Sequence, residues 1–494
     1  MRKLLFALTI FSQNCIAQPE AILKISSQIS TENLKKNLYH LASDQMEGRL
    51  MASHGDTLAS LFIADWFKKN KITAPYENGK SYFQAITSYK VNATGTLTIN
   101  GISYPKSGNY SSPDYFSSLK NGRILVPFYS NPDSLLNDLT AAKGTGKVMY
   151  ISAALNKNIG SEEGMERFMK KLGDTGIVAA ISSFPGTQEL LNSVKKREFL
   201  PKYVKSPDEI APSRMVPVLR LSEEKMNLLL APEKLTVKNI EETIARKSRQ
   251  VFVELRRKIS AEEKKSLQKT TAPNVIGMIK GSDDVADCIV ISAHHDHDGR
   301  NGNEIYYGAV DNASGTVAIM EMASLMNKAV ESGFRPKRTI VFASFTGEER
   351  GLLGSYFYAD HPAVPLSKTR AIMNIDMMGR VDTIYSGKKA DSSYAYILVK
   401  DSLNIGLRSA LYDAAKFVDL KLDTRYEQPQ YAQRRIRGSD QFPFYRKGVP
   451  FLRIDCGFAK EYHKPNDTPD KINYGLLTKQ IQLAFLTLWN MANQ

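Results

Sequence analysis

The chain has 494 residues, of which 42% are hydrophobic and 24% charged, an ordinary globular composition at a length too great for one compact core. Its formal charge of +15 is spread over scattered clusters without interleaved aromatic residues, which argues against nucleic-acid binding. From the length we expect two or three domains. No apolar run approaches the ~20 residues of a membrane span, so we expect no transmembrane segment.

The first residues have the pattern of an export signal. Arg2 and Lys3 precede the apolar run LLFALTIF at 4–11, and the small residues of CIA follow at a plausible cleavage point. We therefore expect a signal peptide at 1–17, a mature chain that begins near Gln18, and a periplasmic or secreted protein.

Two cysteines remain after such a cleavage, Cys288 and Cys456. Both lie in apolar, strand-like contexts, ADCIVIS and LRIDCGF. A disulfide framework is excluded by their number, and buried free thiols are favoured over a single bridge.

The segment that follows the signal pattern reads as the N-terminal part of a catalytic domain, residues 18–115. Residues 30–70 have helical spacing of apolar side chains, with Asp56 as a helix N-cap. From about 80 to 115 the pattern changes to short strands with a tight Asn-Gly turn.

Residues 116–255 read as a separate β/α insert. Strands are predicted at 146–152 and 176–182, with a helix at 162–172 between them and a strand leading into a helix at 215–230. No cluster of histidine, cysteine or paired acids occurs there, so we expect the insert to be non-catalytic.

Residues 256–494 read as the main part of the catalytic domain, after a charged, helix-like linker at 253–269. Near-continuous apolar runs alternate with helices, the last at 474–492, which is typical of a largely parallel sheet buried between helices. The runs are CIVISA (288–293), TIVFASF (339–345), AIMNI (371–375) and VPFLRI (449–454).

Acids or histidines follow each of these runs, where ligands bind in open α/β sheets. They are His294, His295, Asp296 and His297 after the first run, Glu348 and Glu349 after the second, Asp376 after the third, His463 after the fourth, and Asp311 ahead of a helix at 313–330. Histidine and carboxylate ligands without cysteine suit zinc and, less specifically, manganese or cobalt. Two metals that share one carboxylate would use about five protein ligands and leave positions open for water and substrate.

The adjacent acids Glu348 and Glu349 can have separate roles because neighbouring side chains point in different directions. One can bind a metal while the other faces the activated water, whose pKa a metal lowers from ~16 toward ~7. A carboxylate beside that water can take its proton and pass it to a leaving amine.

The motifs SAHHDHDG, GAVDNASG, TGEERGLLGS, NIDMMGR and YHKPNDTPD resemble those of the co-catalytic di-zinc aminopeptidases in content, order and approximate spacing. That family includes glutamate carboxypeptidase, glutaminyl cyclase and the transferrin receptor ectodomain, and LASDQMEGR (41–49) resembles a stretch near the start of its catalytic domain. The resemblance covers most of 30–105 and 265–494, and 120–250 look similar to a protease-associated domain. It implies an α/β, three-layer zinc-exopeptidase-like fold with a central, mostly parallel mixed sheet, plus a smaller β/α protease-associated-like insert.

The resemblance also implies roles for individual residues. Two zinc ions, with Mn²⁺ or Co²⁺ as possible substitutes, would be held by His294, Asp376, Glu349, His463 and, as a bridge between them, Asp311. Asp296 would orient His294, and Glu348 would be the general base and then the acid. Strand alternation places residues 294 and 296 on one face and 295 and 297 on the other, which favours His294 as the ligand and leaves His295 with His297 as the competing pair.

The stretch GSDQF (438–442) departs from the family pattern, in which many relatives have Ser-Asp-His. Gln441 takes the place of the imidazole, which puts one pocket contact in doubt. Asp440 is predicted to bind substrate, and the alternative is a helix cap ahead of QFPFY.

The function implied is an exported aminopeptidase that hydrolyses N-terminal residues from peptides. The alternatives of the same fold are a glutaminyl cyclase, which uses one zinc, a carboxypeptidase that grips a substrate carboxylate with Arg434, Arg435 and Arg437, and a receptor-like binding protein without catalysis. The sequence carries no signal for an oligomeric state.

Overall fold

The computed structural model describes residues 20–106, 109–113, 115–139, 141–160, 162–184, 200–210, 215–246, 251–282, 287–385 and 392–494. The chain divides into two compact units: unit 1 combines the residues up to Ile86 with Thr271–Gln494, and unit 2 is Thr87–Thr270. The signal peptide expected at 1–17 lies outside the described residues.

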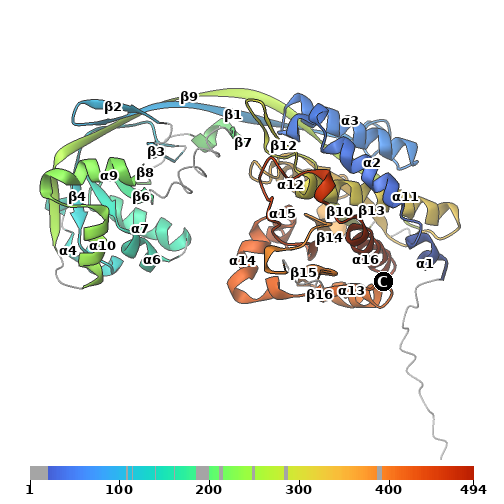
Figure 1. Cartoon of the computed structure of the whole chain (residues 1–494). Helices are drawn as coiled ribbons and strands as arrows, with labels where there is room; N and C mark the ends of the chain where they lie inside the picture. Colours follow the sequence, from blue (N-terminus) through green and yellow to red (C-terminus); the bar gives the residue numbers. More distant parts are fainter. Residues whose placement is uncertain are drawn as a thin grey trace, which may run out of the picture. The chain divides into compact units, whose positions relative to one another are not determined.

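A mixed sheet lies at the centre of unit 1 (Figure 1). Its strand order is β16-β15-β17-β14-β10-β13-β9. The strands are β9 (Phe252–Ile279), β10 (Cys288–His294), β13 (Thr339–Phe345), β14 (Thr369–Ile375), β15 (Tyr394–Lys400), β16 (Lys421–Asp423) and β17 (Phe451–Asp455). β13, β10, β14 and β17 are parallel, and β9 and β15 pair antiparallel on either side of them. The four apolar runs of the sequence form these parallel strands, so the mostly parallel mixed sheet is confirmed.

Side chains of the sheet alternate between two buried layers. Ile289, Ile291 and Ala293 of β10 belong to one hydrophobic core, whereas Cys288 and Val290 belong to the other. Both faces of the strand are therefore apolar, as the continuous run requires.

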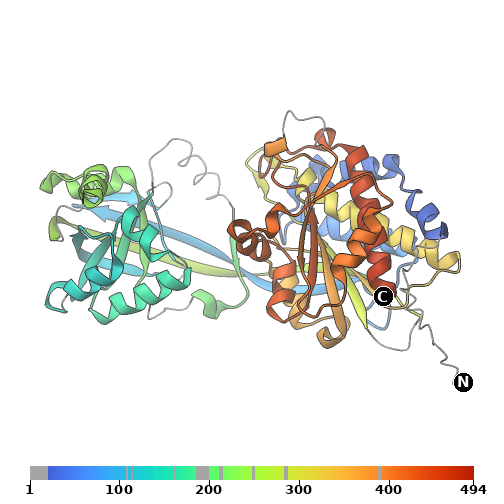
Figure 2. The ribbon, with the colours of Figure 1, turned by 90° about the horizontal axis from the view of Figure 1, so that it is seen from below.

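Helices cover both faces, which gives the predicted three layers (Figures 1 and 2). The first core includes side chains of α1 (Glu20–Ser26), α2 (Thr31–Leu41), α3 (His54–Lys69), α11 (Ser314–Glu331), α13 (Leu407–Ala415) and α16 (Tyr474–Asn493). The second core includes side chains of α12 (Leu353–Asp360), α14 (Pro429–Arg437) and α15 (Gln441–Arg446). In Figure 1 the blue helices α2 and α3 lie beside α11, and in Figure 2 the red helix α16 runs along α13.

The start of α3 differs from the predicted cap. Ser53 is the N-cap, and its hydroxyl accepts a hydrogen bond from the Asp56 N–H. Asp56 lies in the first turn and accepts instead from the Ala52 N–H and the Thr346 hydroxyl. The prediction of Asp56 as the cap was wrong because Ser53 offers an equally good capping side chain one turn earlier.

Unit 2 contains a further series of paired strands and two hydrophobic cores of its own. The strands are β1 (Phe83–Ile99), β2 (Ile102–Pro105), β3 (Tyr110–Ser111), β4 (Ser118–Pro127), β5 (Lys147–Ile151), β6 (Ala179–Phe184), β7 (Lys202–Val204), β8 (Val218–Ser222) and the first part of β9. β4, β5, β6 and β8 are parallel, and their side chains alternate between the two cores. The helices are α4 (Pro132–Asp138), α5 (Ala141–Gly144), α6 (Ala153–Ile159), α7 (Glu162–Asp174), α9 (Glu223–Leu230) and α10 (Val237–Ala245).

The charged linker at 253–269 is not helical but part of the long strand β9. Its side chains alternate between buried and exposed: Leu255, Ile259 and Ala261 are buried, whereas Arg256, Lys258 and Glu262 are exposed. Lysine, arginine and glutamate are good helix formers, so their density masked this strand alternation. The unit boundaries fall within β1 and β9, whereas the sequence placed them at 115/116 and 255/256.

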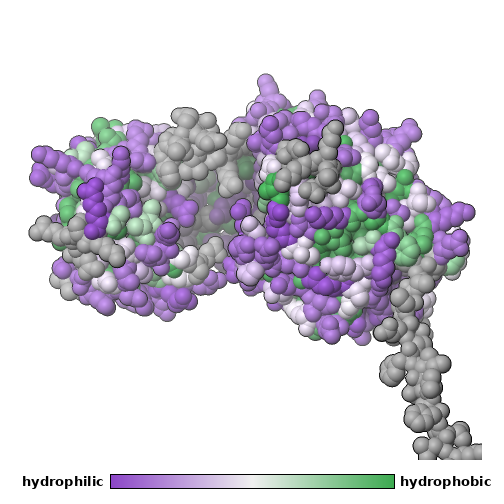
Figure 3. Space-filling view, turned by 60° about the horizontal axis from the view of Figure 1, so that its bottom comes forward, coloured by the Kyte–Doolittle hydropathy of each residue, from purple (hydrophilic) through white to green (hydrophobic). Residues whose placement is uncertain are grey.

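Cys288 and Cys456 are both free and buried, as expected. None of the helices in the described part of the chain is long and apolar enough to cross a membrane. The face drawn in Figure 3 is mainly hydrophilic, with apolar side chains in smaller groups.

Candidate metal centre

The site forms where the parallel strands of unit 1 end. In the register of β10 with β14, Ser292 lies opposite Asn374, so His294 and Asp376 leave the two strands at the same level. In the register of β10 with β13, His294 lies opposite Phe345, and the two glutamates follow in the next turn. Parallel pairing therefore brings together side chains that are far apart in the sequence.

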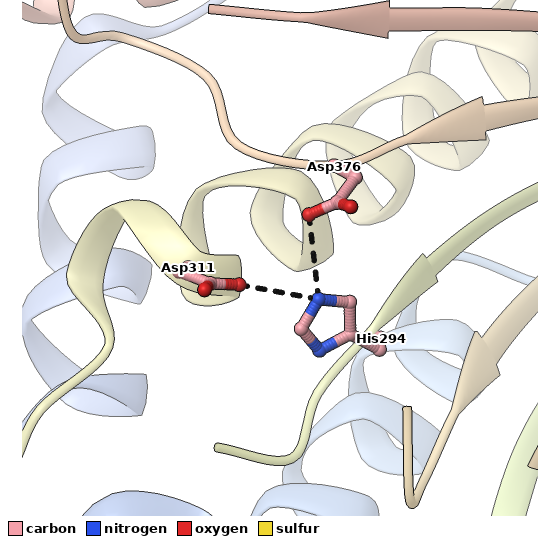
Figure 4. Close-up of side chains that lie close together, drawn as sticks. All are labelled: His294, Asp311 and Asp376. Atoms are coloured by element: carbon pink, nitrogen blue, oxygen red, sulfur yellow. Dashed lines mark ion pairs between the residues drawn. The ribbon is translucent and has the colours of Figure 1, made fainter. Parts of the chain in front are cut away.

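His294 is the centre of a first group of donor atoms (Figure 4). Its Nε2 lies 3.3 Å from Oδ1 of Asp311 and 3.4 Å from Oδ1 of Asp376. All three side chains are buried. In Figure 4 both carboxylates point at the same ring nitrogen from different elements.

His463 is the centre of a second group. Its Nε2 lies 3.0 Å from Oδ2 of Asp311 and 3.2 Å from Oε1 of Glu349. The two oxygens of Asp311 thus face two different histidines. The structure brings together all five residues that the sequence predicted as ligands.

His297 joins the second group, contrary to the prediction that it points away. Its Nδ1 lies 2.9 Å from Oε1 of Glu349. The prediction was wrong because β10 ends at His294, so the strand period does not extend to residue 297. His295 does point away: Ser344 Oγ lies 2.9 Å from its Nδ1, and Ser60 Oγ lies 3.1 Å from its Nε2.

The spacing of the donor atoms fits divalent cations. Ligand atoms around a tetrahedral zinc lie about 3.3 Å apart, given bonds of ~2.0–2.1 Å to nitrogen and oxygen. The contacts of His294 and His463 above span 3.0–3.4 Å. Histidines and carboxylates without cysteine are also the donor set expected for zinc in an open site.

Opposite charges offset the burial of these groups. Burial acts to lower the pKa values of His294 and His463, but the surrounding carboxylates raise both well above the ordinary value. Burial acts to raise the pKa of Glu349, and the neighbouring His463 and His297 hold it well below its usual range. Burial also acts to raise the pKa of Asp376, but the Arg453 guanidinium and the His294 ring together lower it below its usual range.

Two further aspartates adjoin the histidines. The Asp296 Oδ1 is 3.6 Å from Nδ1 of His294 and accepts a hydrogen bond from the Glu348 N–H at 3.1 Å. The Asp298 Oδ2 lies 3.4 Å from Nδ1 of His463, and Arg350 holds the other oxygen of Asp298. Asp298 was not predicted from the sequence, although it lies in a visible His-x-Asp-x-Asp pattern.

Arg49 fastens the loops around the site. Its guanidinium is fully buried and donates to four backbone carbonyls, those of His295 (2.7 Å), Leu41 (2.6 Å), Tyr307 (2.8 Å) and Gly308 (2.9 Å). This residue ends the LASDQMEGR stretch, to which the sequence assigned no role. Through Arg49, that stretch holds in place the loops that follow His294 and precede Asp311.

Asp467 and Asn312 position the loop that carries Asp311. The Asp467 carboxylate accepts from the N–H groups of Val310 and Asp311. The Asn312 side chain donates to the Ile375 carbonyl at 3.0 Å and accepts from the Met377 N–H at 3.1 Å. These bonds tie the Asp311 loop to the segment that contains Asp376. Asn312 and Asp467 were not predicted from the sequence, because these partners lie 63 or more residues away from them.

A cavity of about 160 Å³ opens beside both groups. Its lining includes Glu348, Asp311, Asp376, Arg434 and Tyr462. Glu348 belongs to neither donor group, and burial raises its pKa well above that of an ordinary glutamate. Glu348 therefore faces the cavity beside the two donor groups without belonging to either of them.

Asp440 and Gln441 lie behind the site. Asp440 is fully buried, does not line the cavity and makes no side-chain capping bond, and burial raises its pKa to about 7. Gln441 accepts from Asn374 Nδ2 at 2.9 Å and donates to the carbonyls of Arg435 and Ile436. In place of an imidazole, this chain thus has an amide that ties α14 to β14.

Comparison with known proteins agrees with this architecture. Residues 274–487 match the family model described as peptidase family M28. A probable zinc metalloprotease of Pyrenophora tritici-repentis is 26% identical over 257 residues, which cover 44% of this chain and 56% of that protein. A probable glutamate carboxypeptidase of Arabidopsis thaliana is 34% identical over 104 residues, 21% of this chain and 14% of that protein. The chain therefore spans about half or less of the curated relatives it matches.

Solved structures resemble the chain over almost its whole length. The aminopeptidase from Aneurinibacillus sp. strain AM-1 has a TM-score of 0.57 at 18% identity over 96% of both chains. BSAP, a zinc aminopeptidase from Bacillus subtilis, has a TM-score of 0.55 at 18% identity over 94% of this chain and 96% of the other. At such identity the likeness shows the fold alone. Residues 274–487 are thus similar to peptidase family M28, and the chain shares its fold with aminopeptidases of known structure.

Proposed function

We propose that the chain is a metallo-aminopeptidase that removes N-terminal residues from peptides at a site for two zinc ions. The observation that carries the proposal is the position of Asp311, whose Oδ1 faces His294 and whose Oδ2 faces His463. A carboxylate between two donor groups is the arrangement needed to bridge two cations. The match of residues 274–487 to the peptidase family M28 model supports the reaction class, and aminopeptidases are among the solved structures that share the fold.

Five residues would hold the ions: His294 and Asp376 on one side, Glu349 and His463 on the other, and Asp311 between them. When bound, the ions would polarise the scissile carbonyl and lower the pKa of a coordinated water from ~16 toward ~7. Mn²⁺ and Co²⁺ are possible substitutes because they accept the same ligands.

Glu348 would act as the general base and then as the general acid. It lines the cavity, and its raised pKa suits a group that takes a proton near neutral pH and returns it to the leaving amine. The hydrogen bond from its own N–H to Asp296 fixes the turn that carries it. Asp296 would therefore act as a positioning residue for both Glu348 and His294.

A carboxypeptidase-type reaction is the second candidate, because Arg434 lines the same cavity. Arg435, the other cavity arginine of α14, is instead bound to Asp455 at 2.5 Å, and its guanidinium stacks on the Tyr426 ring at 4.1 Å. Arg434 would then be the group that contacts a substrate carboxylate.

One experiment separates the two reactions. The purified protein is given matched peptides that are free, N-acetylated or C-amidated, with and without a zinc chelator. We expect release of the N-terminal residue from the free and C-amidated peptides only. The chelator should abolish this release, and added zinc should restore it. Cleavage of N-acetylated but not C-amidated peptides would reverse the assignment, and chelator-resistant cleavage would contradict the metal mechanism.

Export to the periplasm or the medium is also part of the proposal. It rests on the charged start and the apolar run of residues 4–11. N-terminal sequencing of the protein from the host's extracytoplasmic fraction tests it: a start near Gln18 is expected, and recovery only in the cytoplasm with Met1 retained would refute it.

A further inference from the structure

His297 occupies a position that the five-ligand scheme does not explain. Its side chain is completely buried, and its Nδ1 lies 2.9 Å from Oε1 of Glu349. The same glutamate oxygen lies 3.2 Å from Nε2 of His463. Donor atoms of His297, Asp311 and Glu349 all lie within 4.8 Å of one another.

Three atoms that meet at the Glu349 carboxylate form no hydrogen bond with one another. Nδ1 of His297, Oε1 of Glu349 and Nε2 of His463 are all buried and all without a hydrogen-bond partner. Buried polar atoms are normally paired, so three such atoms side by side need an explanation. They are close enough to bond to one another but are not aimed at one another, which is the geometry of atoms that converge on a common cation.

The imidazole rings of His297 and His463 meet edge to face and are not stacked on each other. Their ring centroids are 5.4 Å apart, and the ring planes are at 88° to each other. The distances of 2.9 and 3.2 Å to the shared glutamate oxygen are close to the ligand spacing of about 3.3 Å around a tetrahedral zinc.

We propose that His297 supplies, through Nδ1, a fourth protein ligand to the second metal. This inference rests on the proposed two-cation site. The second metal would be held by His297, Asp311, Glu349 and His463, and the first by three protein ligands only, His294, Asp311 and Asp376. Four protein ligands close a tetrahedral zinc site, whereas three leave a position open. The second metal would then be the tightly held one, and the first the exchangeable one that meets the substrate.

Zinc titration of the metal-free, full-length protein against a competing chelator tests this assignment. Two binding constants are measured for the wild type, for His297→Ala and for His361→Ala, a control in which an exposed histidine outside the cluster is removed. We expect His297→Ala to weaken the tighter site at least about tenfold, to leave the other site within about threefold, and the control to match the wild type.

X-ray absorption of the protein loaded with one zinc provides the second measurement. Two imidazoles per zinc are expected in the wild type and one in His297→Ala. The variant His297→Gln separates ligation from simple support of Glu349, because an amide can donate a hydrogen bond to Glu349 but does not replace an imidazole ligand. Affinity restored by glutamine, or one imidazole per zinc in the wild type, would overturn the inference.

The failure of the inference differs from failure of the proposed function. A wild-type protein that binds no zinc would remove the two-cation site itself. A wild type that binds two zinc ions, with both affinities unchanged in His297→Ala, would remove only the role of His297. Circular dichroism of the metal-free variants shows whether each is folded, and His297→Gln serves where the alanine variant is not.

Discussion

Oδ2 of Asp298 lies 3.4 Å from Nδ1 of His463, while Nε2 of the same ring faces Asp311 and Glu349. A carboxylate behind a histidine ligand fixes the orientation of the ring and increases its basicity. Asp298 is itself held by Arg350, so the contact depends on a fixed side chain. The second donor group therefore has the same kind of support that Asp296 gives to the first.

Asp298→Asn tests this support. The amide keeps the shape but removes the charge that favours the His463 Nδ1–H, so we expect zinc affinity to fall about 10–100-fold. Asp419→Asn, which changes an exposed acid paired with Lys479, is the matched control and should bind zinc as the wild type does. Equal zinc affinity in all three proteins would show that Asp298 does not support the ligand.

Glu348→Gln should separate catalysis from metal binding. Because Glu348 lies in neither donor group, we expect unchanged zinc content with kcat lowered about 10²–10⁴-fold. Glu349→Gln should instead lose zinc, since Glu349 belongs to the second group. Turnover and metal analysis of the two variants test the assignment, which would be reversed if the Glu348 variant lost the metal and the Glu349 variant kept it.

Zinc affinity should depend steeply on pH. Despite their burial, His294 and His463 have raised pKa values because of the carboxylates around them, so both rings hold protons in the metal-free protein. A cation binds the neutral ring and must displace these protons. Affinity should therefore rise with pH and fall, by up to about a hundredfold per pH unit, below the raised pKa values. Zinc titrations across pH check this, and a flat profile would contradict it.

Arg49→Met should destabilise unit 1. The change leaves four buried carbonyls without their donor, and we expect a loss of roughly 3–5 kcal/mol in the free energy of unfolding of the metal-free protein. Both tryptophans, Trp66 and Trp489, lie in unit 1, so denaturant unfolding followed by tryptophan fluorescence reports on this unit. The exposed Arg300→Met is the control, and a loss below about 1 kcal/mol in Arg49→Met would contradict the argument.

The sequence predicted the elements whose signal is local. The four apolar runs became the parallel strands, and the acids and histidines after them lie together because parallel strands end at one edge. Where local signals compete, the prediction was wrong: helix-forming charges concealed the strand alternation of 253–269, and strand alternation was extended past the end of β10 to His297.

The supporting contacts could not be predicted from the sequence, because they join distant segments. Arg49 bonds to the His295 and Gly308 carbonyls, 246 and 259 residues away, and Asp467 bonds to backbone that precedes it by 157 residues. No periodicity or motif spacing encodes such pairs. The same holds for Gln441, whose amide bonds to three groups inside the fold rather than to the cavity.

The central proposal is that Asp311 would hold both cations, one through each carboxylate oxygen. Crystals of the zinc-loaded protein, measured with anomalous scattering at the zinc absorption edge, test it most directly. The account predicts two peaks on either side of the Asp311 carboxylate, one beside His294 and Asp376 and the other beside Glu349 and His463. A single peak that Asp311 does not contact, or zinc bound elsewhere in the chain, would contradict it.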